Sequence, residues 1–166
     1  MKVLILMGSD SDVSVMSEAE KVLTEFGVPC MMTIASAHRT PERVETLIKE
    51  AERKGADAII CGAGMAAHLA GAVAAKTVLP VIGVPLDASP MGGMDALLST
   101  VQMPPGIPVA TVAIGKAGAK NAAHLALQII ARKDKALTNK LRAYRKGMAA
   151  DVIKKAKSLD TGARRK

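Results

Sequence analysis

The sequence predicts an α/β protein whose central parallel sheet of about five strands is covered by helices on both faces. Short apolar runs alternate with longer stretches in which apolar residues recur every three or four positions, as they do in repeated βαβ units. The apolar runs are not interrupted by polar residues, which is typical of parallel strands buried on both faces. The chain has 166 residues, of which 49% are hydrophobic, so it can form one such domain with a sizeable core.

The first unit begins at the N-terminal end of the chain. Residues 3–7 are Val-Leu-Ile-Leu-Met, and this run breaks into Gly-Ser-Asp-Ser-Asp at residues 8–12. In an open parallel sheet, ligands bind beyond the carboxyl ends of the strands, where glycine lets the backbone come close to them. Residues 8–12 are therefore the first candidate binding loop, although Ser11 or Asp12 would also serve as a simple helix N-cap.

The later elements repeat this alternation. Apolar runs predict further strands over residues 28–35, 58–63, 80–85 and 109–114. Apolar residues at helical spacing predict helices over residues 16–26, 41–54, 69–77, 94–101 and 115–132. Thr40 and Pro41 give the second helix an N-cap and a first residue, and Gly27 and Gly55 end the first two helices. No linker interrupts the pattern, so we predict a single domain over residues 1–166.

The C-terminal segment, residues 133–166, differs in charge. From Arg132 onward the chain has thirteen Lys and Arg against three Asp, a net charge of +10, while the whole chain carries +8. The preceding residues therefore carry −2. Apolar side chains recur on this basic segment as a narrow seam of Leu137, Leu141, Tyr144, Met148 and Val152. We expect a long helix and tail that pack on a neighbouring subunit, with an ordinary intramolecular helix as the alternative.

Composition excludes several other classes of protein. Aromatic residues make up 1% of the chain, so base stacking on nucleic acid is almost excluded, and we expect no nucleic-acid partner. Cys30 and Cys61 lie inside apolar runs and suggest neither a disulfide framework nor a metal site. The sequence has neither the pattern of a signal peptide nor an apolar run of ~20 residues, so we expect a cytoplasmic protein without a membrane partner.

Four loops are predicted to meet at the carboxyl edge of the sheet, at residues 8–12, 36–39, 62–68 and 86–93. Their side chains include Ser9, Asp12, Ser36, His38, Arg39 and His68. An Arg and hydroxyls suit a phosphate, a carboxylate suits ribose hydroxyls, and imidazole suits proton transfer near neutral pH. This set predicts a site for a phosphorylated ribose compound.

One generic motif favours a different site. Gly62-Ala-Gly64-Met-Ala-Ala67 matches G-x-G-x-x-A, and Asp87 follows at about the distance of a ribose-binding acid in a dinucleotide fold. Against this interpretation, the motif lies on the third strand and its helix is short and interrupted by Gly71. A nicotinamide-dependent oxidoreductase and a non-catalytic nucleotide-binding module remain alternatives to an enzyme that uses His38.

Five stretches carry a more specific signal. MGSDSD, SAHRTP, GAGMAAHLAG, VIGVP and VQMPPGIPVATVAIGKAGAKNAA occur in that order and cover nearly all of the chain to about Arg132. They closely resemble the N5-carboxyaminoimidazole ribonucleotide mutases of purine biosynthesis, the PurE family. The resemblance implies a three-layer flavodoxin-like fold and a homo-octamer. It also implies a cofactor-free, metal-free reaction that moves a carboxylate from the exocyclic nitrogen of the ribonucleotide to ring carbon C4.

The resemblance also implies roles for individual residues. Ser9 and Arg39 would bind the phosphate, Asp12 the ribose hydroxyls, and His38 would transfer the proton at the exocyclic amine and C4. The rest of the pocket would be lined by Gly8, Ser36 and the backbone of Ala66, Ala67 and His68. Carbon dioxide would leave nitrogen and be recaptured at C4, and a tightly closing Gly/Ala loop would keep it from escaping.

Two positions depart from the family pattern GAGGAAHLPG. Met65 replaces a Gly and Ala70 replaces the Pro. If position 65 has a positive φ, Met65 is strained there by roughly 1 kcal/mol or more. A related branch of the family carboxylates aminoimidazole ribonucleotide directly with carbon dioxide, and it departs from the AAHL pattern kept here. The mutase is therefore favoured over the direct carboxylase.

Overall fold

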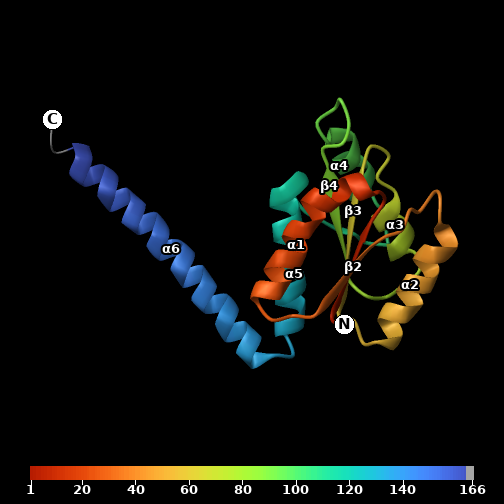
Figure 1. The fold of residues 1–166 in the computed structure, drawn as a ribbon, viewed down its shortest axis with the longest axis horizontal. Coiled ribbons are helices and arrows are strands. Elements are labelled where there is room, and N and C mark those ends of the chain that lie inside the picture. Colours follow the sequence, from red (N-terminus) through yellow and green to blue (C-terminus); the bar gives the residue numbers. More distant parts are fainter. Residues whose placement is uncertain (164–166) are drawn as a thin grey trace. The chain divides into compact units, whose positions relative to one another are not determined.

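The structure, a computed structural model, describes residues 1–163 (Figure 1). The chain divides into two compact units, Met1–Ile129 and a C-terminal unit that begins at Ile130. The first unit contains the sheet and its helices, and the second consists mainly of one long helix. We describe each unit by itself.

The first unit is built on a parallel sheet whose strands are β1 (Val3–Met7), β2 (Cys30–Ile34), β3 (Ala58–Gly64), β4 (Val81–Leu86) and β5 (Ala110–Thr111). Their order in the sheet is β2-β1-β3-β4-β5. Met7 pairs with Ile34 on one side and with Gly62 on the other, so the carboxyl ends of these strands lie together. The chain changes direction across the sheet at β1, and ligands bind at such a switch point in open α/β sheets. The predicted flavodoxin-like architecture is confirmed.

Helices cover both faces of this sheet, as predicted. They are the short 3-10 helix η1 (Asp10–Asp12) and the α-helices α1 (Val13–Glu25), α2 (Pro41–Arg53), α3 (Leu69–Ala74), α4 (Met94–Val101) and α5 (Gly115–Ala131). Figure 1 shows α1 and α5 on one side of the sheet and α2 and α3 on the other. All five residues of β1 are buried, because their alternate side chains meet a helical layer on each face. Residues 3–7 are therefore all apolar because both faces of β1 are buried.

The helical layers pack on the sheet through small and flexible side chains. On the face of α2 and α3, Leu4 and Leu6 join one buried cluster with Val44, Ile48 and Val73. On the other face, α5 is fully buried along a stripe of alanines, Ala119, Ala122, Ala123 and Ala126. The low aromatic content is compatible with a dense core because short side chains let the helices approach the sheet closely.

The last predicted strand is shorter than expected. The apolar run predicted a strand over residues 109–114, but β5 covers only Ala110 and Thr111. One further backbone bond follows, from the Val112 N–H to the Gly83 carbonyl, at 3.0 Å. The chain then turns into α5, and Gly118 lies so close to Ala113 that a Cβ there would be 1.6 Å from the Ala113 carbonyl oxygen. This return of the helix ends the strand.

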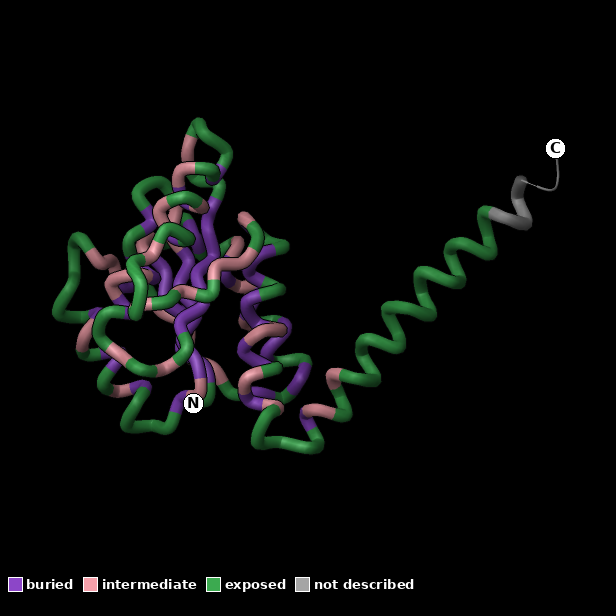
Figure 2. Tube along the Cα trace, turned by 180° about the vertical axis from the view of Figure 1, so that it is seen from behind, coloured by how far each residue is buried: buried purple, intermediate pink, exposed green. Residues whose placement is uncertain are grey.

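The second unit contains α6 (Lys135–Ala163). Its first turn is fixed by Asp134, whose carboxylate accepts the Leu137 N–H at 2.9 Å. Leu137 is buried, whereas Tyr144, Met148 and Val152 of the predicted seam are exposed along the helix (Figure 2). Within residues 1–163, no helix combines the length and apolar character needed to cross a membrane.

Candidate active site

A cleft of about 550 Å³ opens beyond the carboxyl ends of β1, β2, β3 and β4. It is lined by Gly8, Ser9, Ser11, Asp12, Ser36, Ala37, His38, Arg39, Ala63, Gly64, Met65, Ala66, His68, Leu69 and Ala88. The structure thus brings together eight of the nine residues singled out from the sequence, the exception being Ala67. All four predicted loops contribute, the fourth through Ala88 alone.

The loop after β1 is held by hydrogen bonds among its own residues. The Ser9 N–H donates to Asp12 Oδ2 at 3.0 Å, and the Ser9 hydroxyl accepts the Ser11 N–H at 3.4 Å and caps η1. Asp12 is buried, and burial raises the pKa of its carboxyl group, while hydrogen bonds from Ser9 and Ser11 oppose the rise. Asp10 is exposed, and the hydrogen bond from the Ser9 hydroxyl lowers the pKa of its carboxyl group. Of the two carboxylates, only Asp12 lines the cleft.

The loop after β2 carries His38 and Arg39 on a turn that is closed by hydrogen bonds between Ser36 and Thr40. The Thr40 hydroxyl accepts the Ser36 N–H at 2.9 Å and donates to the Ser36 carbonyl at 3.2 Å. Thr40 does occupy the N-cap position of α2, but its hydroxyl makes no capping bond because it closes this turn. The Ser36 hydroxyl in turn accepts the Arg39 N–H at 3.2 Å. Hydrogen bonds within residues 36–40 therefore hold the turn that carries His38 and Arg39.

Arg39 joins the first two loops. Its guanidinium donates to the Gly8 carbonyl at 2.9 Å. A guanidinium has five N–H donors, so it can hold this carbonyl and an anion at the same time. The contact places a permanent positive charge beside Gly8 and Ser9, where the predicted phosphate would lie.

The loop after β3 contains an unusual backbone conformation at Met65. Met65 has φ 54°, the only positive φ of a non-glycine residue among residues 1–163. An L-residue in this region is strained by about 1–2 kcal/mol. The Met65 side chain is 60% exposed, so packing offsets little of this strain. The positive φ on which the expected strain at Met65 depended is therefore present.

Ala67 is the predicted site residue that does not line the cleft. It is buried, and its N–H donates to the Ser99 hydroxyl of α4 at 3.0 Å. Ser99 could not be identified from the sequence, because a serine inside a predicted helix has no distinguishing pattern and its partner lies 32 positions away. Ser11, Ala37 and Ala88 of the cleft wall were also not predicted.

His38 and His68 meet across the cleft. Nε2 of His38 lies 2.8 Å from Nδ1 of His68, and the two rings are nearly perpendicular, with an interplanar angle of 83°. One nitrogen must donate and the other accept, so the two rings share one proton at this contact. The third histidine, His124, packs edge-on against Phe26, with ring centroids 5.7 Å apart.

The glycines of the dinucleotide-like motif have a packing explanation. A Cβ on Gly62 would lie 2.4 Å from the Met16 sulfur, and one on Gly64 would lie 2.7 Å from the Ala88 Cβ. Both glycines are therefore required by helix and loop packing. Asp87, the proposed ribose acid of that motif, lies beside Gly115 and is absent from the cleft wall. The geometry does not favour the dinucleotide interpretation.

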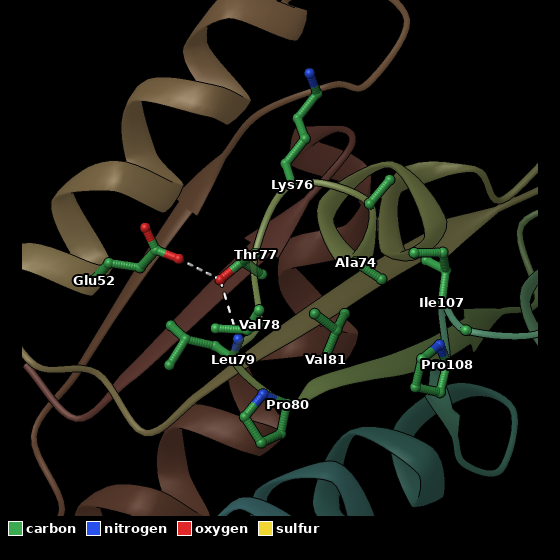
Figure 3. Close-up of a pocket in the computed structure, with 12 residues that line it drawn as sticks. Glu52, Ala74, Lys76, Thr77, Val78, Leu79, Pro80, Val81, Ile107 and Pro108 are labelled. Atoms are coloured by element: carbon green, nitrogen blue, oxygen red, sulfur yellow. Dashed lines mark hydrogen bonds between the residues drawn. The ribbon is translucent and has the colours of Figure 1, made fainter.

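A larger hollow, of about 870 Å³, lies at the opposite edge of the sheet, where β4 begins (Figure 3). Its charged lining residues are Glu52 and Lys76. The Thr77 hydroxyl donates to Glu52 and accepts the Leu79 N–H, so these polar groups bind one another. No histidine lines this hollow. The smaller cleft is the better candidate because it combines an imidazole pair, a guanidinium and a buried carboxylate.

Comparison with known proteins identifies the family of this chain. The model of the AIR carboxylase family matches residues 2–151. The N5-carboxyaminoimidazole ribonucleotide mutase of Pyrococcus horikoshii is 58% identical over 156 residues, which cover 94% of this chain and 87% of the relative. The enzyme of the same name from Thermotoga maritima is 50% identical over 159 residues, with 96% and 92% of the two chains covered. The crystal structure of Treponema denticola PurE superposes with a TM-score of 0.84 and 33% identity, covering 92% of this chain and 94% of that one.

Proposed function

This chain belongs to the AIR carboxylase family, and from that membership we infer that it is an N5-carboxyaminoimidazole ribonucleotide mutase. The enzyme is an isomerase of purine biosynthesis that moves a carboxylate from the exocyclic nitrogen of its substrate to ring carbon C4. The observation that carries the inference is the 58% identity to a curated mutase over 94% of the chain. The cleft supplies the groups that such a substrate requires.

Substrate binding is assigned to the first two loops. Arg39 and the Ser9 hydroxyl would hold the phosphate, and Asp12 would accept the ribose hydroxyls. This assignment is supported by the hydrogen bond between Arg39 and the Gly8 carbonyl, which brings the guanidinium to the Ser9 loop before any ligand arrives. Gly8 and Ser36 accept hydrogen bonds from Arg39, and Ala66 and His68 form the facing side of the site, while Ala67 is buried and does not line it.

Proton transfer is assigned to His38. When the bond between nitrogen and the carboxyl carbon breaks, carbon dioxide leaves and the exocyclic nitrogen takes a proton from the imidazole. C4 then attacks the carbon dioxide, a carbon–carbon bond forms, and the imidazole removes the proton from C4. The histidine returns to its starting state, so the reaction needs no net proton.

The loop after β3 closes the site around the released carbon dioxide. Met65 and Ala66 line the cleft, and neither has an ionisable side chain that would react with carbon dioxide in place of C4. A small apolar enclosure disfavours water and keeps the reactive fragment beside C4.

The proposed assembly is a homo-octamer in the cytoplasm, with residues 133–163 packing on a neighbouring subunit of a single-domain protomer; the remainder of the predicted segment, residues 164–166, lies outside the described residues. The exposed seam of Tyr144, Met148 and Val152 supports an interface on α6, because covering apolar side chains with another protein surface is energetically favourable. The opposite net charges of the two parts of the chain, −2 and +10, favour contact between copies.

Product formation by the purified protein, without ATP or metal, tests the function. One sample contains N5-carboxyaminoimidazole ribonucleotide, and the other contains aminoimidazole ribonucleotide with bicarbonate. A mutase converts the first rapidly and the second slowly, with a need for very high bicarbonate. Preference for the second sample would identify a direct carboxylase instead, and inactivity with both would contradict the proposal.

A further inference from the structure

Ser99 connects α4 to the loop that carries His68. Its hydroxyl accepts the Ala67 N–H at 3.0 Å and donates to the Ala96 carbonyl, one turn earlier in α4, at 3.2 Å. Ala67 is 2% exposed, so its N–H is shielded from water and needs a partner inside the protein. A hydroxyl can accept and donate at once, which is what this position requires.

Residues 65–68 lie between the end of β3 at Gly64 and the start of α3 at Leu69. Within this segment Met65 is in the left-handed region, and the His68 N–H donates back to the Ala66 carbonyl at 2.9 Å. The bond to Ser99 attaches the middle of this strained turn to a helix. A strained conformation persists only where its surroundings hold it in place.

We propose that Ser99 is a positioning residue for the reaction: through the Ala67 N–H it fixes the 65–68 turn, and with it the place of the His68 ring against His38. This inference rests on the proposed function, and it concerns a residue that does not line the cleft. The His38–His68 contact of 2.8 Å lies within the range in which proton transfer is efficient.

The structure separates positioning from substrate binding. The groups assigned to the phosphate and ribose lie in the loops after β1 and β2, which are held by their own hydrogen bonds and by Arg39. Among these three loops, Ser99 forms a hydrogen bond with the loop after β3, through the Ala67 N–H. Loss of its hydroxyl should therefore lower kcat and leave KM nearly unchanged.

The test compares Ser99→Ala with Thr100→Val. The Thr100 hydroxyl donates to the same Ala96 carbonyl, at 2.7 Å, and valine keeps its shape. Both variants lose a hydroxyl from α4, but only Ser99→Ala leaves the Ala67 N–H without its partner. We expect kcat of Ser99→Ala to fall about tenfold, equivalent to ~1.4 kcal/mol, with KM changed less than about twofold. We expect Thr100→Val to keep both constants.

Hydrogen exchange provides a readout that does not depend on activity. The peptide that contains Ala67 should exchange faster in Ser99→Ala than in the wild type or in Thr100→Val. An inactive wild type would overturn the proposed function alone. Faster exchange in Ser99→Ala would still support the attachment of the 65–68 turn to α4. Unchanged exchange, an unchanged kcat, or a rise in KM without loss of kcat would each overturn the role of Ser99.

Two further variants complete the test. Ser99→Thr retains the hydroxyl and should restore kcat to near the wild-type value, and a Thr variant as slow as the Ala variant would count against the role. If Ser99→Ala does not fold, Ser99→Cys replaces the oxygen with a weak acceptor of similar size. The Cys variant should also lose kcat, and wild-type turnover in it would overturn the proposal.

Discussion

Nε2 of His38 and Nδ1 of His68 lie 2.8 Å apart although the two residues are 30 positions apart in the chain. His38 comes from the loop after β2 and His68 from the loop after β3, and these two strands lie on opposite sides of β1. The topological switch at β1 therefore creates the imidazole pair. Because the two rings share one proton at this contact, a change to either ring alters the hydrogen bonding of the other.

His38→Asn should separate catalysis from binding. We expect kcat to fall by about 10²–10⁴-fold, because an amide cannot transfer the proton that the reaction moves. Product affinity, measured by calorimetry, should stay within a few-fold of wild type. His68→Asn is the matched comparison and should lose less turnover, since His38 remains. Wild-type turnover in His38→Asn would exclude the mechanism.

Met65→Gly should stabilise the protein. Glycine removes the strain at φ 54°, and the exposed Met65 side chain contributes little packing. After the entropy of the unfolded glycine is subtracted, we expect a gain of roughly 0.5–1 kcal/mol in the free energy of unfolding. Thermal unfolding measures it, with Met91→Gly as the control. Met91 is similarly exposed, at 63%, but has no positive φ, so its variant should not gain stability.

Asp12→Asn should raise stability at neutral pH while weakening substrate binding. Burial raises the pKa of the Asp12 carboxyl above its ordinary value of 3.8, so the charged form destabilises the folded state at higher pH. The wild type regains this stability as pH falls through the raised pKa. The melting temperature of Asp12→Asn should therefore exceed that of the wild type at pH 7, and the difference should shrink on acidification towards pH 3.8.

Asp10→Asn provides a control of opposite sign for this pH series. The Ser9 hydroxyl lowers the pKa of the Asp10 carboxyl below 3.8, so its charged form favours the folded state. That contribution is present above pH 3.8 and is lost as pH falls through the lowered pKa. At neutral pH, Asp10→Asn should thus be less stable than the wild type, whereas Asp12→Asn should be more stable. Parallel pH profiles for both variants would contradict the assignment.

Gly62→Ala tests the packing explanation of the dinucleotide-like motif. The new Cβ would meet the Met16 sulfur at 2.4 Å, and we expect a loss of about 1–3 kcal/mol in the free energy of unfolding. Gly147→Ala is the control, since a Cβ there meets nothing within 4 Å and alanine favours a helix. It should not lower stability. Binding of NAD by the wild type would revive the alternative interpretation.

Much of the fold could be predicted because the signals are local. The buried strands β1, β3 and β4 are short apolar runs, and polar or glycine residues follow or end them, as at Gly8 after β1 and Gly64 at the end of β3. The edge strand β2 is largely apolar as well, but none of its residues is fully buried. The convergence of Ser9, His38, Arg39 and His68 followed from parallel strands having their carboxyl ends at one edge. The positive φ at Met65 was predictable only because the family pattern has a glycine there.

The remainder depends on contacts between distant segments. The length of β5 is set by the return of α5 over Ala113, which no local pattern encodes. The bond from Ala67 to Ser99, and the packing of Gly62 against Met16, each join segments more than 30 positions apart. A motif search finds the glycines but cannot tell whether a ligand or a methionine lies above them.

The order of strands around β1 also has an evolutionary consequence. Under the proposed roles, the loop after β1 and Arg39 recognise the unreactive end of the substrate, whereas His38 and the loop after β3, held by α4, surround the reacting end. Substitutions that accumulate in residues 8–12 would then adjust affinity to the metabolite concentration of a particular cell. Substitutions in residues 65–68 or α4, such as the Met at position 65, would adjust the speed of the chemical step independently. Lineages could thus tune affinity and speed by separate routes within one small fold.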